Sequence, residues 1–85
     1  MNRSDIYGAI TAEREVQAER WGGAHAWGEG DCSSGTVAPT TKVAVLTEEC
    51  GEVARAVLDG QPELLRRELV QVAAVAVAWL EGLEG

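Results

Sequence analysis

Apolar residues recur along this chain at spacings of three and four, the pattern of amphipathic helices. Three stretches follow this pattern, and each is expected to form a helix, at about residues 5–21, 40–59 and 62–82. Residues 22–39 are rich in Gly and Ser and follow no period, so we expect a loop there. Loops this long in compact domains are usually functional lids or disordered segments.

The first helix has a weak apolar stripe, formed by Ile6, Ala9, Ile10 and Val16. Ser4 or Asp5 is placed to cap its first turn. The second helix has one continuous apolar face, which we expect to be buried: Val43, Leu46, Cys50, Val53, Ala54 and Val57. Thr40 or Thr41 is expected to cap this helix and Gly60 to end it.

The third helix is expected to start at Pro62 and to be buried nearly all round. Its valines also fit a strand, but its length and its interspersed alanines favour a helix. Its apolar breadth exceeds what two partner helices of one chain could cover, on the side with Val70, Ala73, Val77 and Leu80. The pattern therefore predicts an all-α fold, a small helical bundle completed by homo-oligomerisation.

Composition narrows the class of protein. With 85 residues the chain is expected to form one domain with a thin core. Its net charge of −7 argues against nucleic acid as a partner, because such partners require a basic surface. The longest nearly apolar run, residues 69–80, is too short to span a membrane, and the amino terminus lacks the apolar region of a signal peptide. We therefore expect a soluble cytoplasmic protein. Cys50 falls on the apolar face of the second helix, where a thiol acts as a small hydrophobe, and no disulfide with Cys32 is expected.

Three glutamates crowd the second helix within the segment LTEECGEVARAVLDG. At about 100° per residue, Glu48 and Glu52 lie roughly 40° apart and Glu49 about 60° beyond Glu52, so all three share one sector. Val45 and Ala56 lie in line with Glu49 and Glu52, so this acidic stripe is apolar at both ends. A helix face that is exposed to solvent is not usually apolar at both ends.

Glu68 interrupts an apolar stripe on the third helix, among Leu64, Leu65, Val72, Val75 and Trp79. A carboxylate taken out of water without a partner costs several kcal/mol or becomes protonated. A hard cation removes this penalty, and carboxylates without His or Cys suit Mg²⁺ or Mn²⁺. The alternatives are a solvated acidic face on the second helix and, for Glu68, an ion pair with Arg14, Arg55 or an arginine of a second subunit.

Three short motifs stand out in the chain: EECGE on the second helix, ELVQ on the third, and EREVQAERWG on the first. The first two resemble the signature of the MazG-like all-α nucleoside triphosphate pyrophosphohydrolases, E-E-x-x-E on one helix and E-x-x-D on the next. The third resembles a stretch of the small, often phage-borne members of that family. The resemblance implies that the Mg²⁺ ligands are Glu48, Glu49, Glu52 and Glu68. Where the pattern ends in Asp, this chain has Gln71, which can serve as a weaker ligand, an outer-shell donor or a base-contacting group.

The resemblance also implies a reaction. A nucleoside triphosphate would be cleaved to the monophosphate and pyrophosphate by water activated at the metal, with Glu49 or Glu52 taking the proton. Lys42 and Arg14 or Arg20 are candidates for phosphate contact, with Arg20 the weakest of these. Trp21, His25 and Trp27 flank the loop where a base could stack, and Gln17 could hydrogen-bond it. The alternative for Trp21, which we favour, is that it anchors the first helix to the core. The resemblance further implies that the protein assembles into homodimers or homotetramers.

Two further functions compete with this one. The replacement of Asp by Gln71 favours a catalytically weak nucleotide-binding or regulatory relative. A structural helical interaction module with solvated acids is the third reading, and it predicts that Mg²⁺ leaves the melting temperature unchanged.

Overall fold

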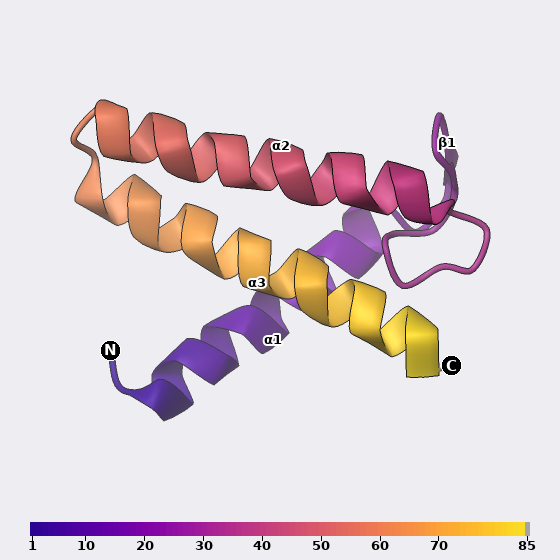
Figure 1. The fold of residues 1–85 in the computed structure, drawn as a ribbon. Helices are drawn as coiled ribbons and strands as arrows, with labels where there is room; N and C mark the ends of the chain where they lie inside the picture. Colours follow the sequence, from indigo (N-terminus) through magenta and orange to yellow (C-terminus); the bar gives the residue numbers. More distant parts are fainter. Residues whose placement is uncertain (85) are drawn as a thin grey trace.

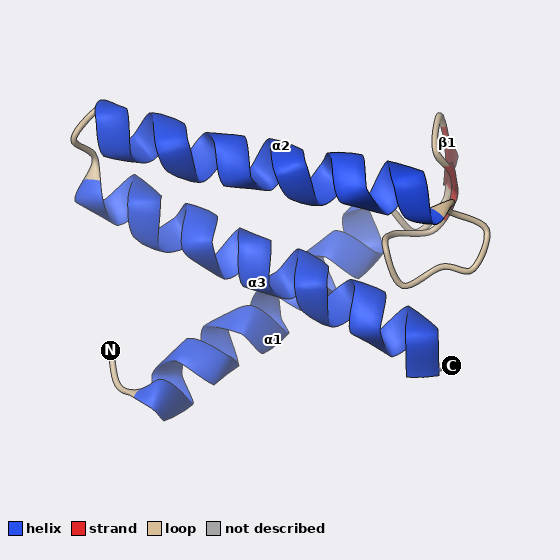
Figure 2. Cartoon of the chain, viewed as in Figure 1, coloured by secondary structure: helices blue, strands red, loops and turns tan. Residues whose placement is uncertain are grey.

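The computed structural model describes residues 1–84, which form three helices joined by a long loop and a tight turn (Figure 1). The helices are α1 (Arg3–Arg20), α2 (Pro39–Leu58) and α3 (Pro62–Glu84). The only strands in this described part are the two-residue β1 (Ala24–His25) and β2 (Gly28–Glu29), both in the loop (Figure 2). The prediction of an all-α fold is confirmed, and every helix bound lies within two residues of the expected one.

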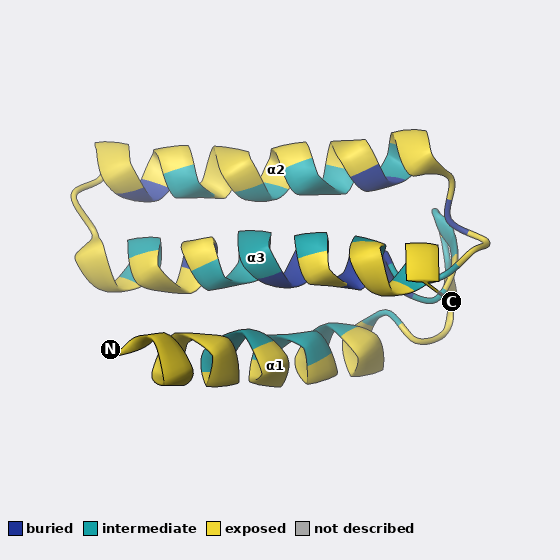
Figure 3. Cartoon of the chain, turned by 60° about the horizontal axis from the view of Figure 1, so that its bottom comes forward, coloured by how far each residue is buried: buried dark blue, intermediate teal, exposed yellow. Residues whose placement is uncertain are grey.

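The helix α3 is central in the fold. It runs antiparallel to α2 after the turn at Gly60, and α1 crosses it on the opposite side (Figure 1). The turned view places α3 between α2 and α1, which do not pack directly against each other (Figure 3). The core is correspondingly thin, and its buried apolar residues are Cys32, Val37, Ala56, Ala74, Val75 and Ala78.

The expected caps of α1 and α2 are wrong, whereas the expected end of α2 is correct. Asn2 caps α1: its side chain accepts a hydrogen bond from the backbone N–H of Asp5, and Asp5 accepts one from the backbone N–H of Asn2. The cap position of α2 is Ala38, which offers no side-chain acceptor, and Pro39 starts the helix instead. Gly60 ends α2 with a φ of +63°, a conformation that favours glycine.

The expected buried face of α2 is rotated by roughly 80° from the observed one. Four of its residues are exposed: Val43, Cys50, Ala54 and Val57. The stripe that faces α3 contains Lys42, Val45, Leu46, Glu49, Val53 and Ala56, all buried or half-buried. Apolar periodicity favoured the more hydrophobic stripe, but the packed one includes Glu49, which finds a polar partner inside, and Ala56, which is small enough for close helix packing.

The expectation that α3 is buried nearly all round is also wrong for the single chain. Leu69, Val77 and Leu80 are 52%, 36% and 57% exposed. The opposite face is inward as expected, because Val75 is buried and Glu68 is only 9% exposed. Within the described residues, none of the helices combines the length and apolarity needed to cross a membrane.

The loop between α1 and α2 is folded back on the helices. The strands β1 and β2 pair antiparallel, and Thr36 ties β2 to the rest of the loop by accepting from the Glu29 N–H and donating to its carbonyl. Val37 is 2% exposed and anchors the loop in the core. At the carboxyl end of α3, Gly82 lies so close to the loop that a Cβ would stand 2.7 Å from the Ser33 carbonyl oxygen. The second half of the loop is thus held against the helices at Ser33 and Val37.

Candidate functional site

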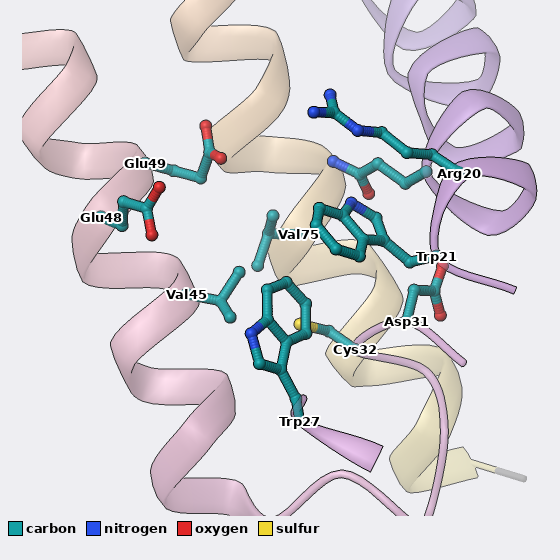
Figure 4. A pocket seen from close by; sticks show the side chains of 10 residues that line it. Arg20, Trp21, Trp27, Asp31, Cys32, Val45, Glu48, Glu49 and Val75 are labelled. Atoms are coloured by element: carbon teal, nitrogen blue, oxygen red, sulfur yellow. The ribbon is translucent and has the colours of Figure 1, made fainter. Parts of the chain in front are cut away.

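A pocket of about 240 Å³ opens between the carboxyl end of α1, the loop and the first half of α2 (Figure 4). Its polar and aromatic lining comes from three segments: Gln17, Arg20 and Trp21 of α1 and its cap, Trp27 and Asp31 of the loop, and Glu48 and Glu49 of α2. Figure 4 shows the glutamates on one side and the indoles on the other, with Val45 and Val75 between them. Acidic and aromatic groups therefore share one cavity.

The aromatic wall is a stack of two indoles. Trp21 and Trp27 have ring centroids 4.5 Å apart and an interplanar angle of 25°. The turn between β1 and β2 brings Trp27 back over Trp21, and the His25 ring meets both indoles edge-on. The His25 Nε2 donates to the Gly30 carbonyl at 2.7 Å while Nδ1 accepts from the Trp27 N–H at 3.3 Å, so the imidazole is a fixed part of the loop.

Arg20 provides the positive charge at this pocket. Its guanidinium carbon lies 5.3 Å from the centroid of the Trp21 ring, within the range of a cation–π contact. Sequence reasoning ranked Arg20 below Arg14 as a phosphate contact. The signal that could have found it is the spacing of Gln17, Arg20 and Trp21, which places all three on one face at the end of the helix.

The acidic side of the pocket continues inward between α2 and α3. Glu49 is half-buried and Glu68 is buried, and the Gln71 amide lies between them. With the amide nitrogen directed at the two acids, Gln71 Nε2 lies 2.9 Å from Glu49 Oε2 and 3.2 Å from Glu68 Oε2. Glu48 and Glu52 are exposed on the flank of α2. The structure thus brings Glu49, Glu68 and Gln71 together, with the two exposed acids beside them.

Negative charge accumulates around Glu49. Burial raises the pKa of the Glu49 carboxyl above its ordinary value of 4.5. Neighbouring carboxylates raise this pKa further, in the order Glu68, Glu48, Glu52 and Glu13. Glu13 belongs to α1, and sequence reasoning missed it, although it stands one helical turn before Gln17. Acids from all three helices therefore raise the pKa of Glu49, and among residues 1–84 no ion pair with a basic side chain involves Glu49 or Glu68.

Arg14, expected to contact substrate, does not itself line the pocket and is held in two ion pairs, one of them with the lining residue Asp31. Its Nη1 lies 2.7 Å from Asp31 Oδ2 and its Nε lies 2.9 Å from Glu81 Oε1, and its side chain is 11% exposed. Burial alone would raise the pKa of Asp31, but hydrogen bonds from Ser33 and Arg14 lower it below its ordinary value. Arg14 therefore links α1, the loop and the end of α3.

Lys42 and Cys50 lie outside their expected roles, whereas the expectation that Cys32 and Cys50 form no disulfide is confirmed. Lys42, the other candidate for phosphate contact, is 6% exposed and is not part of the pocket lining. Cys50, expected to be buried, is exposed. Cys32 is buried and lines the pocket, and its burial raises the pKa of its thiol, which disfavours the reactive thiolate.

The donor set fits a hard divalent cation in chemistry and in charge. It consists of carboxylates and one amide, the oxygen ligands that Mg²⁺ and Mn²⁺ prefer. Burial and the neighbouring carboxylates both raise the pKa of Glu49, and a cation bound among these carboxylates would relieve their mutual repulsion. Between Met1 and Glu84, no three carboxylate, imidazole or thiolate groups already converge on a common point.

The chain has no significant match among protein-family models, curated proteins or solved structures. Its resemblance to the MazG-like enzymes therefore stays a prediction.

Proposed function

We propose that this protein is a Mg²⁺-dependent pyrophosphohydrolase of nucleoside triphosphates, of the MazG-like all-α type. The observation that carries the proposal is that one pocket joins Glu48 and Glu49 to the stacked Trp21 and Trp27. Carboxylates recruit the cation that accompanies a triphosphate, and indole faces stack on any planar base. A nucleoside triphosphate has a cation-binding triphosphate at one end and a planar base at the other, and thus matches both sides of the pocket.

The proposed metal ligands are the residues of the acidic cluster, Glu48, Glu49, Glu52 and Glu68, with Gln71 as a weaker ligand or an outer-shell group. A bound Mg²⁺ or Mn²⁺ supplies charge neutralisation for the phosphates and acidifies water. A carboxyl with a raised pKa is a better proton acceptor near neutral pH, which favours Glu49 over the exposed Glu52 as the base.

The proposed substrate contacts come from the opposite wall of the pocket. Trp21 and Trp27 offer their faces to the base, and Gln17 can hydrogen-bond its edge. Arg20 takes the phosphate-binding role first assigned to Arg14, because Arg20 lines the pocket while Arg14 is occupied by Asp31 and Glu81.

We also propose that two or four copies assemble. The exposed apolar residues of α2 and α3 form faces that a second copy can cover, and they include Val43, Val57, Val77 and Leu80. A homo-oligomer would thicken the core that the single chain leaves thin.

An assay with separate readouts tests the enzyme. The purified protein is incubated with each common (deoxy)nucleoside triphosphate, with and without Mg²⁺, while pyrophosphate and orthophosphate are measured separately. We expect Mg²⁺-dependent release of pyrophosphate that is lost in Glu49→Gln and kept in Glu15→Gln, an exposed glutamate of α1. Release of orthophosphate alone would contradict the proposed cleavage position.

A second candidate function is a nucleotide-binding relative with little catalysis. The observation that favours it is Gln71, which places an uncharged amide where the family pattern has Asp. This candidate predicts nucleotide binding without pyrophosphate release, and activity gained in Gln71→Asp. If the protein neither binds nucleotide nor melts at a higher temperature with Mg²⁺, both functions are rejected in favour of a structural module.

A further inference from the structure

The Gln71 amide occupies the space between two carboxylates that come from different helices. Glu49 projects from α2 and Glu68 from α3, and the terminal amide atom of Gln71 lies 2.9 and 3.2 Å from an oxygen of each. Carboxylate oxygens only accept hydrogen bonds, so an amide oxygen at this position would meet two acceptors, whereas the nitrogen has one N–H for each acid. The nitrogen therefore faces the acids.

We propose that the Gln71 amide is a built-in substitute for the metal ion: its NH₂ group bridges Glu49 and Glu68 in the metal-free protein and turns over when a cation binds. The inference rests on the proposed function, because the cation site is part of it. It assigns Gln71 the role of a positioning residue that holds the empty site together and controls how readily it accepts metal.

The Gln71 bridge reduces the electrostatic repulsion between Glu49 and Glu68. In the described residues, neither Glu49 nor Glu68 forms an ion pair with a lysine, arginine or histidine. Hydrogen bonds to an ionised acceptor are about twice as strong as those between neutral groups. Two such bonds from one amide therefore offset part of the repulsion that would otherwise separate α2 from α3 at this point.

Turning the amide exchanges its two ends without moving the helix. A half-turn about the last side-chain bond puts the carbonyl oxygen where the nitrogen was, and that oxygen is repelled unless a cation lies between it and the acids. Gln71 also borders a groove of about 230 Å³ between α1 and α3, which leaves the side chain room to rotate. An Asp at this position would instead add a negative charge to the metal-free cluster, so Gln71 favours the empty state and weakens metal affinity.

The first arm of the test is a double-mutant cycle in EDTA. Gln71→Met keeps the length of the side chain and removes both donors, and we expect a melting temperature lower by about 5 °C or more. In the background of Glu49→Gln, where the repulsion is gone, the same change should lower it by less than half as much. Gln61→Met, at an exposed glutamine in the turn after α2, is the matched control and should leave the melting temperature unchanged.

The second arm measures Mg²⁺ affinity by calorimetry. Gln71→Glu retains the shape of the side chain and adds a charge, so it should melt at a lower temperature in EDTA and bind Mg²⁺ at least about tenfold tighter than the unmodified protein. Side-chain NH₂ resonances give an independent readout, because the chain has only Gln17, Gln61 and Gln71 as glutamines. The pair that disappears in Gln71→Met should shift on adding Mg²⁺.

The outcomes separate the two proposals. An unchanged melting temperature of Gln71→Met in EDTA, or an equal loss with and without the Glu49 charge, overturns the role of Gln71 even where Mg²⁺ still binds and pyrophosphate is still released. Coupling in EDTA combined with no Mg²⁺ binding by either the unmodified protein or Gln71→Glu overturns the cation site, and the substitute role with it.

Discussion

Glu49 is a half-buried carboxyl that faces acids from all three helices. Its raised pKa means that the folded chain holds a proton on Glu49 more tightly than the unfolded chain does. The stability contributed by the protonated form is complete below the ordinary value of 4.5 and is lost as the pH rises through the folded pKa. Ionised Glu49 therefore opposes folding at neutral pH.

We predict that Glu49→Gln raises the melting temperature of the metal-free protein at neutral pH, by roughly 2–5 °C given the partial exposure of the site. Scanning calorimetry in EDTA measures the effect, and the gain should vanish below pH 4.5, where both side chains are neutral. Glu15→Gln on the exposed side of α1 is the control. A lower melting temperature for Glu49→Gln at neutral pH would contradict the crowding of charge inferred at this residue.

Asp31 has the opposite sign of pH dependence. Its pKa is lowered by Ser33 and Arg14 despite its burial, so its contribution to stability is complete above the ordinary value of 3.8 and is lost as the pH falls through the folded pKa. We predict that Asp31→Asn lowers the unfolding free energy at neutral pH by about 1–3 kcal/mol. The unfolding free energy of this variant should also decrease less steeply as the pH is lowered. Urea titrations over this pH range check both effects, with Asp59→Asn, in an exposed pair with Arg55, as the control. Equal acid sensitivity in Asp31→Asn would refute the assignment.

The residues of the candidate site differ in how far the sequence could place them. The position of Glu68 within the apolar stripe of α3 follows from the helical period alone, so its burial was predictable. The approach of Glu49 to the helix interface was not, because it depends on which stripe of α2 packs against α3. The choice between Arg14 and Arg20 depended on the path of the loop, which carries Asp31 to one arginine and Trp27 to the pocket beside the other. The path of the loop could not be predicted, because its residues follow no hydrophobic period.

Individual elements were more predictable than their ends. Hydrophobic spacing located α1, α2 and α3, and Gly60 and Pro62 marked the turn between the last two. The caps were missed because several adjacent residues could serve: Asn2 competes with Ser4 and Asp5, and Pro39 starts α2 one residue before the threonines. The short hairpin of β1 and β2 was missed because two-residue strands leave no alternation to detect.

The contact between α3 and the loop depends on the missing side chain of Gly82. A Cβ there would stand 2.7 Å from the Ser33 carbonyl oxygen, so α3 or the loop must move to accept it. We predict that Gly82→Ala destabilises the protein by on the order of 1–3 kcal/mol. Chemical denaturation measures this change.

Gly51→Ala is the matched control for Gly82→Ala. Gly51 lies inside α2 with open space around its Cβ position, so alanine there should stabilise the helix by up to about 1 kcal/mol. Stabilisation in both variants would mean that the loop does not rest against the end of α3.

The whole molecule is a central helix flanked by two others that do not meet. This arrangement leaves apolar residues of α2 and α3 in water, including Val57 at 59% and Leu80 at 57% exposure. The hydrophobic period showed that α3 has more apolar surface than one chain can cover. It could not show which of the two adjacent stripes of α2 is buried, because both stripes are partly apolar and the packing against α3 determines the choice.

We predict that the protein sediments at micromolar concentration as a species larger than its 9.0 kDa chain mass. Val57→Glu and Leu80→Glu place a charge on the exposed apolar faces and should shift the species toward the monomer, while Gln61→Glu, on the exposed turn, should not. Sedimentation velocity distinguishes these states. A single 9.0 kDa species for the unmodified protein would refute assembly.

The stack of Trp21 on Trp27 gives the unmodified molecule its own optical signal. Two indoles with centroids 4.5 Å apart and planes inclined by 25° couple their electronic transitions, which produces a pair of circular dichroism bands of opposite sign. The remaining tryptophan, Trp79, lies on α3 and has no indole partner within the described residues, so it contributes no such pair. A planar molecule that inserts between the two indoles separates them and abolishes the coupling. Loss of the paired circular dichroism bands in the far ultraviolet therefore reports that a ligand occupies the pocket.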